Sequence, residues 1–262
     1  SFAATAGSVA FLVLLSWGTG RQAIGAMDPG NVPMAPSTAL ILILLSASVF
    51  VRSRAALTRS TQRIAFYTVA GIGALSVVVL ARFIFGFELA FERWLVPTGE
   101  RIGSVPLGRM SPSTAIAFAL SALAFLLASP AVLPGRRRLL AAEAFAAAAI
   151  GSSLVSLFGY LSGTPYAFGP SSIPMAILTA VCFALLNGAT LGNAICGYGA
   201  VPQSGSHVLD LSAAQSSVLS KRLAAVFLLV AMVLGSGALM YSRHRMREIR
   251  ASTDRELSAV AD

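Results

Sequence analysis

The residues of this 262-residue chain that are able to do chemistry are few and scattered. His207 and His244 lie far from one another and from any group of cysteines or carboxylates, so they do not predict a metal or haem site. Cys182 lies inside an apolar run and Cys196 at its end, with no second pair at metal or redox spacing. The sequence also has no glycine-rich phosphate loop, Ser-His-Asp set or paired carboxylates. We therefore expect no catalytic residue, no metal ligand and no cofactor, and we do not expect this segment to be an enzyme.

Two ionisable residues lie inside long apolar runs, where a charge is a candidate for function. Glu143 follows Arg138 by five residues, so we expect it to lie near the membrane surface and to pair with one of the three arginines 136–138. Arg82 lies near the end of its run, where its long side chain can reach lipid headgroups. Arg82 is therefore a candidate ligand-binding residue, with headgroup contact as the simpler interpretation.

A short motif, Met-x-x-x-Thr-Ala, opens three of the apolar runs, at Met34, Met110 and Met175. The first two copies carry proline where a helix would begin, a position at which proline costs no hydrogen bond. The hydroxyl side chains that follow can satisfy the unpaired N–H groups of a first helical turn. They can also join the helix dipoles in binding a carboxylate, a phosphate or a lipid headgroup, although repeated capping after duplication is the simpler interpretation. The candidate ligand-binding residues of this motif are Ser37, Thr38, Ser113, Thr114 and Thr179.

A second motif, an aromatic residue three positions before a glycine, ends the run that precedes each of these starts. Its copies are Trp17 to Gly20, Phe83 to Gly86 and Tyr160 to Gly163. Glycine can adopt the left-handed conformation that ends a helix, and aromatic rings favour the membrane interface. The sequence therefore predicts one unit repeated three times: a helix, its aromatic-x-x-Gly stop, an outer loop, and a helix opened by Met-x-x-x-Thr-Ala.

The helices that carry these motifs are predicted to cross a membrane. The chain is 56% hydrophobic and 11% charged, and it has no Asp, Glu, Lys or Arg between Glu143 and Asp210. A soluble domain has roughly 25% charged residues. Seven runs approach the roughly 20 apolar residues that a span needs, namely 2–17, 34–51, 64–85, 111–132, 139–161, 173–195 and 223–241. The predicted fold class is all-α: a polytopic membrane protein with seven transmembrane helices as three repeated hairpins plus one helix, and a C-terminal polar helical extension.

The basic residues predict the orientation of these spans. Arginine and lysine gather without acids in the connections 52–63, 136–138 and 221–222, which the positive-inside rule places in the cytoplasm. The net charge of +9 is therefore interpreted as topogenic, and no nucleic-acid partner is expected. The predicted domains are a six-helix membrane domain (1–195), a cytoplasmic loop (196–221) and a seventh helix with its polar extension (222–262). Seven crossings put the tail outside the cytoplasm, although its five arginines favour the opposite side.

Taken in order, three stretches resemble the multi-pass N-terminal membrane sensor modules of bacterial PAS-containing sensor histidine kinases and GGDEF diguanylate cyclases. They are Trp17-x-x-Gly20 leading to Val32 to Ala39, Gly108 to Phe118, and Leu157 to Gly163 running to Met175. The likeness covers about residues 10–195. It implies a sensory or anchoring module of the bacterial inner membrane that passes a signal to a kinase or cyclase output domain beyond residue 262. By the same analogy the module forms a homodimer.

Two other functions remain open at this point. Internal repeats are common in transporters and channels, yet these repeats run in parallel and bring almost no polar residue to the middle of the membrane. An accessory subunit of a larger membrane complex would also have many small and aromatic residues. The expected partners are accordingly the lipid bilayer and either a second copy of the chain or other membrane subunits.

Overall fold

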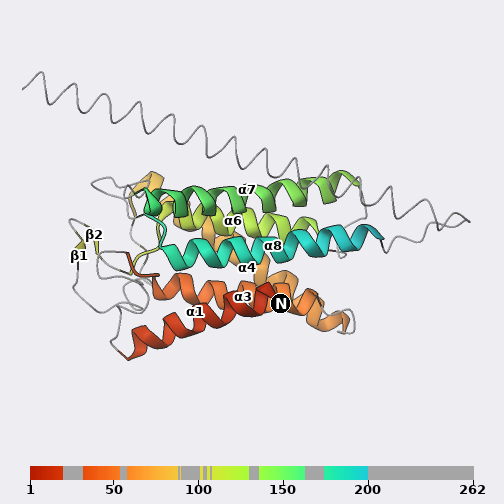
Figure 1. Cartoon of the computed structure of the whole chain (residues 1–262), viewed down its shortest axis with the longest axis horizontal. Helices are drawn as coiled ribbons and strands as arrows, with labels where there is room; N and C mark the ends of the chain where they lie inside the picture. The colour runs from red at the N-terminus through yellow and green to blue at the C-terminus, as the bar shows by residue number, and fades with distance from the viewer. Residues whose placement is uncertain are drawn as a thin grey trace, which may run out of the picture.

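The computed structural model describes residues 1–19, 32–53, 58–87, 89, 101–102, 105–106, 108–129, 136–162 and 174–199 (Figure 1). Within these ranges the chain forms six helices: α1 (Phe2–Gly18), α3 (Pro36–Arg52), α4 (Arg59–Phe85), α6 (Pro112–Leu127), α7 (Arg136–Leu161) and α8 (Ile177–Gly199). Between α4 and α6 lie two strands of two residues each, β1 (Arg101–Ile102) and β2 (Val105–Pro106), which pair antiparallel to one another. The all-α prediction is confirmed for this part of the chain. The seventh predicted run and the polar tail lie outside the described residues.

The helix ends differ from the ends of the apolar runs. Helix α4 begins at Arg59, before the run that starts at residue 64, because Thr58 caps it: the Thr58 hydroxyl oxygen accepts a hydrogen bond of 3.4 Å from the Thr61 N–H. Helix α6 ends at Leu127, short of residue 132, and α8 continues to Gly199, past residue 195. Hydropathy marks the apolar part of a helix and misses the caps and polar turns at its ends.

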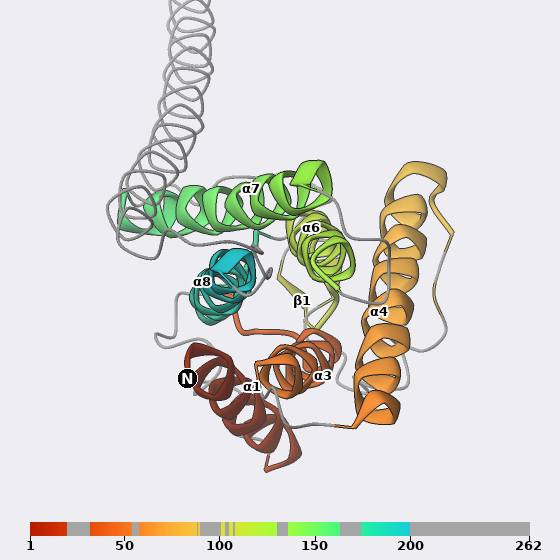
Figure 2. The ribbon, with the colours of Figure 1, turned by 90° about the vertical axis from the view of Figure 1, so that its right-hand side faces the viewer.

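The six described helices divide into central and peripheral ones (Figure 2). The central helices are α3, α6 and α8, and α8 contacts both of the others. Each peripheral helix contacts two central ones: α1 packs on α3 and α8, α4 on α3 and α6, and α7 on α6 and α8. Each peripheral helix therefore packs against the central helix that follows it in sequence and against one other.

The central helices bury the same positions of the Met-x-x-x-Thr-Ala motif. The three methionines are at most 2% exposed, and the alanine five residues after each is fully buried. Eight residues after each methionine comes a large, fully buried side chain: Leu42, Phe118 or Phe183. The rings of Phe118 and Phe183 meet edge to face, with their centroids 4.7 Å apart. The three helices thus present equivalent faces to the interior.

Among the described helices, two are long and apolar enough to cross a membrane, judged by length and composition: α4, with 27 residues, and the Arg138–Leu161 part of α7, with 24. At about 1.5 Å per residue both exceed the roughly 30 Å of a hydrocarbon core. The other apolar helices are shorter: Phe2–Gly18, Pro36–Arg52, Pro112–Leu127 and Ile177–Asn193. Each of these would extend about 25 Å, a little less than the hydrocarbon core.

Candidate functional site

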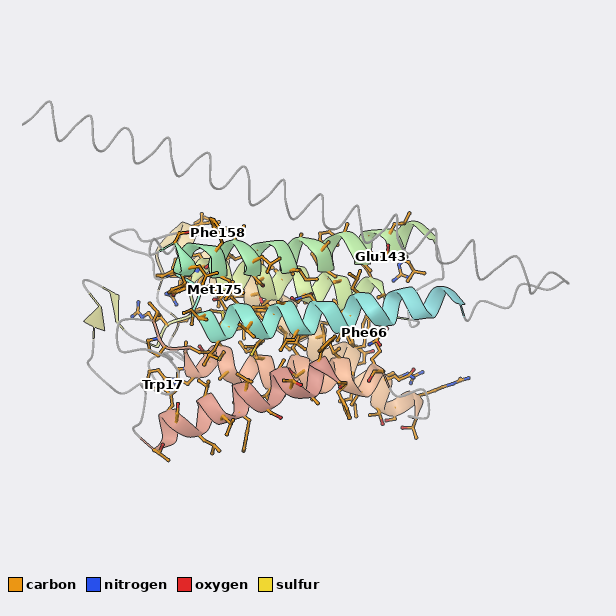
Figure 3. The ribbon with its side chains drawn as sticks, in the orientation of Figure 1. Trp17, Phe66, Glu143, Phe158 and Met175 are labelled. Atoms are coloured by element: carbon orange, nitrogen blue, oxygen red, sulfur yellow. The ribbon has the colours of Figure 1, made fainter. Side chains whose placement is uncertain are left out.

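The candidate ligand-binding residues gather at one end of the bundle, where α3, α6 and α8 begin, which we call the motif end. Trp17, Phe158 and Met175 lie at this end, whereas Phe66 and Glu143 lie at the opposite one (Figure 3). The indole Nε1 of Trp17 donates a hydrogen bond of 2.8 Å to the carbonyl oxygen of Met34. This bond joins the aromatic residue of the stop motif to the first residue of the start motif within one hairpin.

The helix ends at the motif end confirm part of the predicted local structure. Gly86 has the left-handed conformation, φ 73°, and its N–H donates a 2.8 Å hydrogen bond to the Arg82 carbonyl oxygen. Pro36 and Pro112 occupy the first helical position, as predicted. Helix α1 instead ends before Gly20, at Gly18, with Thr19 as its cap residue at φ −95° and ψ 2°, outside the left-handed region. Gly20 and Gly163 lie outside the described residues.

The capping role predicted for the motif hydroxyls is wrong in α3 and α6. In α6 the cap is Ser111, whose Oγ accepts a 3.2 Å hydrogen bond from the N–H of Thr114. In α3 the cap residue is Ala35, which has no side-chain hydrogen bond to offer. Because proline occupies the first helical position, Ser37 and Thr38 lie inside the first turn, where a side chain does not cap.

Four of the five motif residues that carry these hydroxyls are instead buried in the protein. Thr38, Thr114 and Thr179 are each at most 3% exposed, and Ser37 is 2% exposed. The Ser37 hydroxyl is buried without a hydrogen-bond partner in the described part of the chain. Ser113 is partly exposed, and its hydroxyl lies 3.0 Å from that of Ser111. The structure therefore brings the five predicted residues to one end of the bundle, on three different helices.

Arg82 is buried at the motif end and does not extend to the surface as predicted. It is 8% exposed, and its guanidinium lies 4.7 Å from the centroid of the Phe83 ring. A Cβ atom on Gly73 would lie 3.3 Å from the Cβ of Ala122. Gly73 of α4 and Ala122 of α6 therefore lie at the same level along the bundle. Arg82 lies nine residues beyond Gly73 in α4, and Ser113 lies nine residues before Ala122 in α6. Because the two helices run antiparallel, Arg82 and Ser113 lie at the same level along the bundle. Among the described residues, this end therefore combines a cation with the first turn of a helix, both of which favour anionic groups.

At the opposite end, which we call the arginine end, two arginines from different helices satisfy the last carbonyl groups of α6. Arg52, the last residue of α3, donates hydrogen bonds to the carbonyl oxygens of Phe125, at 2.8 Å, and Ala128. Its guanidinium also lies 5.0 Å from the centroid of the Phe125 ring. Arg138 of α7 donates a 2.9 Å bond to the Leu127 carbonyl oxygen. Three hairpins are thus joined at the C-terminus of one helix, where cations are favoured.

Glu143 is buried at the arginine end, with 8% of its surface exposed. Figure 3 shows it on α7 at the end opposite Met175. Its place near a membrane surface stays a prediction. The side chains of Arg136 and Arg137 lie outside the described part, so pairing with the 136–138 cluster stays a prediction.

The middle of the bundle contains polar side chains, whereas almost none were expected there from the sequence. The Asn187 side-chain amide on α8 donates hydrogen bonds of 2.9 Å to the Ser121 hydroxyl of α6 and to the Phe183 carbonyl oxygen. Ser46 of α3 is also buried, and its hydroxyl has no partner among the described residues. Ser and Asn in an apolar run carry no motif and no charge, so the sequence gives no signal that predicts these positions.

A pair of alanine substitutions tests the link between Ser121 and Asn187. We expect Ser121→Ala to lower the free energy of unfolding by about 0.6 kcal/mol, because it removes a hydrogen bond between helices in an apolar interior. Ser46→Ala is the matched control, since its buried hydroxyl has no partner to lose within the described ranges, and it should leave stability unchanged or raise it. Unfolding in detergent, followed by circular dichroism during titration with dodecyl sulfate, measures both. Equal losses in the two variants would contradict the assignment.

The chain matches no protein-family model, no curated protein and no solved structure. The resemblance to bacterial sensor modules therefore stays a prediction from the sequence motifs.

Proposed function

We propose that this chain is a multi-pass membrane domain of the bacterial inner membrane, with a sensory or anchoring role in a signal-transduction protein. The observation that carries the membrane part is the distribution of side chains. Large apolar residues are exposed on the peripheral helices, among them Phe11, Val77, Ile84 and Phe158, while serine, threonine and asparagine are buried. This distribution is the reverse of what water favours and suits a lipid solvent.

The proposal includes seven crossings, arranged as three copies of one hairpin followed by a single helix. The central helices bury equivalent positions, which supports the proposal that the hairpins are copies of one unit. A close contact between the two helices of a hairpin, found in the first and second hairpins, supports it as well. A Cβ on Gly7 would lie 3.1 Å from Ser46 Cβ, and the contact of Gly73 with Ala122 is its counterpart in the second hairpin. Each glycine lies 13 residues before the glycine of its stop motif, and each partner 12 residues after the methionine of its start motif.

The sensory part rests on the motif end. Helix starts from three hairpins bring hydroxyl groups to one end together with the buried Arg82. A ligand bound there would contact more than one hairpin, and its binding energy would act on their relative positions. That is the physical requirement for passing a signal through the bundle.

The native polypeptide tests the proposed role. We expect an antibody against this segment to detect, in alkaline-washed membranes, a polypeptide larger than the 27.0 kDa of the segment. Once purified, that polypeptide should phosphorylate itself from ATP or synthesise cyclic di-GMP. A 27 kDa polypeptide held in a larger complex, without either activity, would contradict the signalling role and favour an accessory subunit.

Replacing the three motif threonines tests the sensory part separately. We expect Thr38→Val, Thr114→Val and Thr179→Val together to leave membrane insertion intact, because valine has nearly the same shape. The response of the output activity to its stimulus should be abolished, because three buried hydroxyls are removed from the motif end. Output activity of the full-length protein, normalised to its amount in the membrane, is the measurement. A full response in the triple variant would exclude ligand binding by these hydroxyls.

A further inference from the structure

One face of α4 carries exposed arginines at the arginine end and apolar side chains along the rest of its length. Arg59, Arg63 and Tyr67 are all exposed and follow one another at intervals of four residues, so they lie on the same face of the helix. Tyr67 is 70% exposed, and the neighbouring Ile64 is 63% exposed. The exposed face continues through Gly71, Ala74 and Val78 without a charge.

The arginines at the arginine end whose side chains the structure describes fall into two groups. Arg52 and Arg138 are engaged with the carbonyl groups at the end of α6. Arg59 and Arg63, in contrast, point away from the bundle with exposed side chains. Glu143, on α7, is the only acidic residue within the described ranges, and it is buried. The positive charge of Arg59 and Arg63 is therefore directed outward.

Two arginines in this position are unfavourable for the helix on its own. Like charges four residues apart repel, and a cation in the first turn, here Arg59, opposes the helix dipole. The first turn of α4 has no acidic residue to offset either effect. A negative group between the two guanidinium groups would remove both penalties.

We propose that the face formed by Arg59, Arg63 and Tyr67 binds an anionic phospholipid. The two guanidinium groups would hold its phosphate, as arginine readily does, and the Tyr67 ring would lie at the interface. The acyl chains would then run along the apolar continuation of the same face. This inference rests on the membrane location proposed above and adds the class of lipid and the residues that select it.

The test uses the purified chain and compares dioleoylphosphatidylglycerol with dioleoylphosphatidylcholine by native mass spectrometry. We expect the wild-type chain to bind phosphatidylglycerol more tightly. Arg59→Gln should weaken that binding about 5-fold, and Arg59→Gln with Arg63→Gln up to about 25-fold, with little change for phosphatidylcholine. Arg59→Lys with Arg63→Lys keeps the charge and should retain most of the preference. Arg247→Gln with Arg250→Gln removes two charges from the tail instead and should retain all of it.

Several outcomes would overturn the proposal. Equal binding of both lipids by the wild-type chain would do so, as would an equal loss of binding in the tail variant. Preferential binding of a short RNA by Arg59 and Arg63, without a lipid preference, would assign the face to another partner. Flotation of each variant with phosphatidylcholine vesicles separates the two proposals. A chain that floats but does not select phosphatidylglycerol contradicts only the lipid site, whereas a chain that does not float contradicts the membrane location as well.

Discussion

Replacing Arg52 with methionine is expected to lower the free energy of unfolding by about 3 kcal/mol, one of the two largest effects we predict. The substitution removes two charge-assisted hydrogen bonds and leaves the carbonyl groups of Phe125 and Ala128 without these donors. In an apolar surrounding such carbonyl groups are costly, because no water replaces the donor. Titration with dodecyl sulfate, followed by circular dichroism, gives the difference in free energy.

Two further variants at the arginine end serve as controls. Arg52→Lys retains the charge but not the planar fork, so we expect it to lose about half as much stability as the methionine variant. Arg63→Met removes an arginine that is exposed and should change stability by less than about 0.5 kcal/mol. If Arg52→Met and Arg63→Met were equally stable, Arg52 would not hold the end of α6 in place.

Replacing Gly73 with leucine is the second substitution with a large expected effect. A Cβ at this position would lie only 3.3 Å from Ala122, so the branched side chain would push α4 away from α6. Overpacking of this kind costs about 1 to 3 kcal/mol and, between membrane helices, also removes the close approach that small residues allow. We expect the variant to insert in the membrane and to unfold at lower dodecyl sulfate concentration than the wild-type chain.

Gly71, in the same helix, is the matched control for this substitution. It is exposed, and a Cβ on it would meet nothing within 4 Å. Gly71→Leu should therefore be neutral or slightly stabilising, because leucine favours the helix more than glycine does. A loss of stability as large as that of Gly73→Leu would show that helix propensity or insertion, and not packing, determines the result.

The positions of the six described helices were predictable because each is marked by a continuous apolar run. The turn at Gly86 and the prolines at the two helix starts were also predictable, since they depend on local backbone conformation. Helix ends were predicted less well. The caps Thr58 and Ser111 lie outside the apolar runs or at their edge, where hydropathy carries no signal.

Contacts between distant parts of the chain were not predictable. The bonds from Arg52 to Phe125 and Ala128 join residues 73 and 76 positions apart, and the bond from Asn187 to Ser121 joins residues 66 positions apart. Arg82 was expected at the surface because long basic side chains often reach lipid headgroups, yet it is buried. Such contacts depend on how helices pack, and one sequence does not encode packing in a local pattern.

The central claim is that three copies of one hairpin lie side by side in the membrane with their motif starts on the same face. Accessibility of single cysteines tests it, after Cys182 and Cys196 have been replaced with serine. Asn31→Cys, Ser104→Cys and Ser172→Cys precede the three central helices, whereas Thr58→Cys and Pro134→Cys precede α4 and α7. In spheroplasts we expect a membrane-impermeant maleimide to label the first three cysteines at once, and the last two only after the membrane is permeabilised. Labelling that divides the first three cysteines between the two faces would contradict the account.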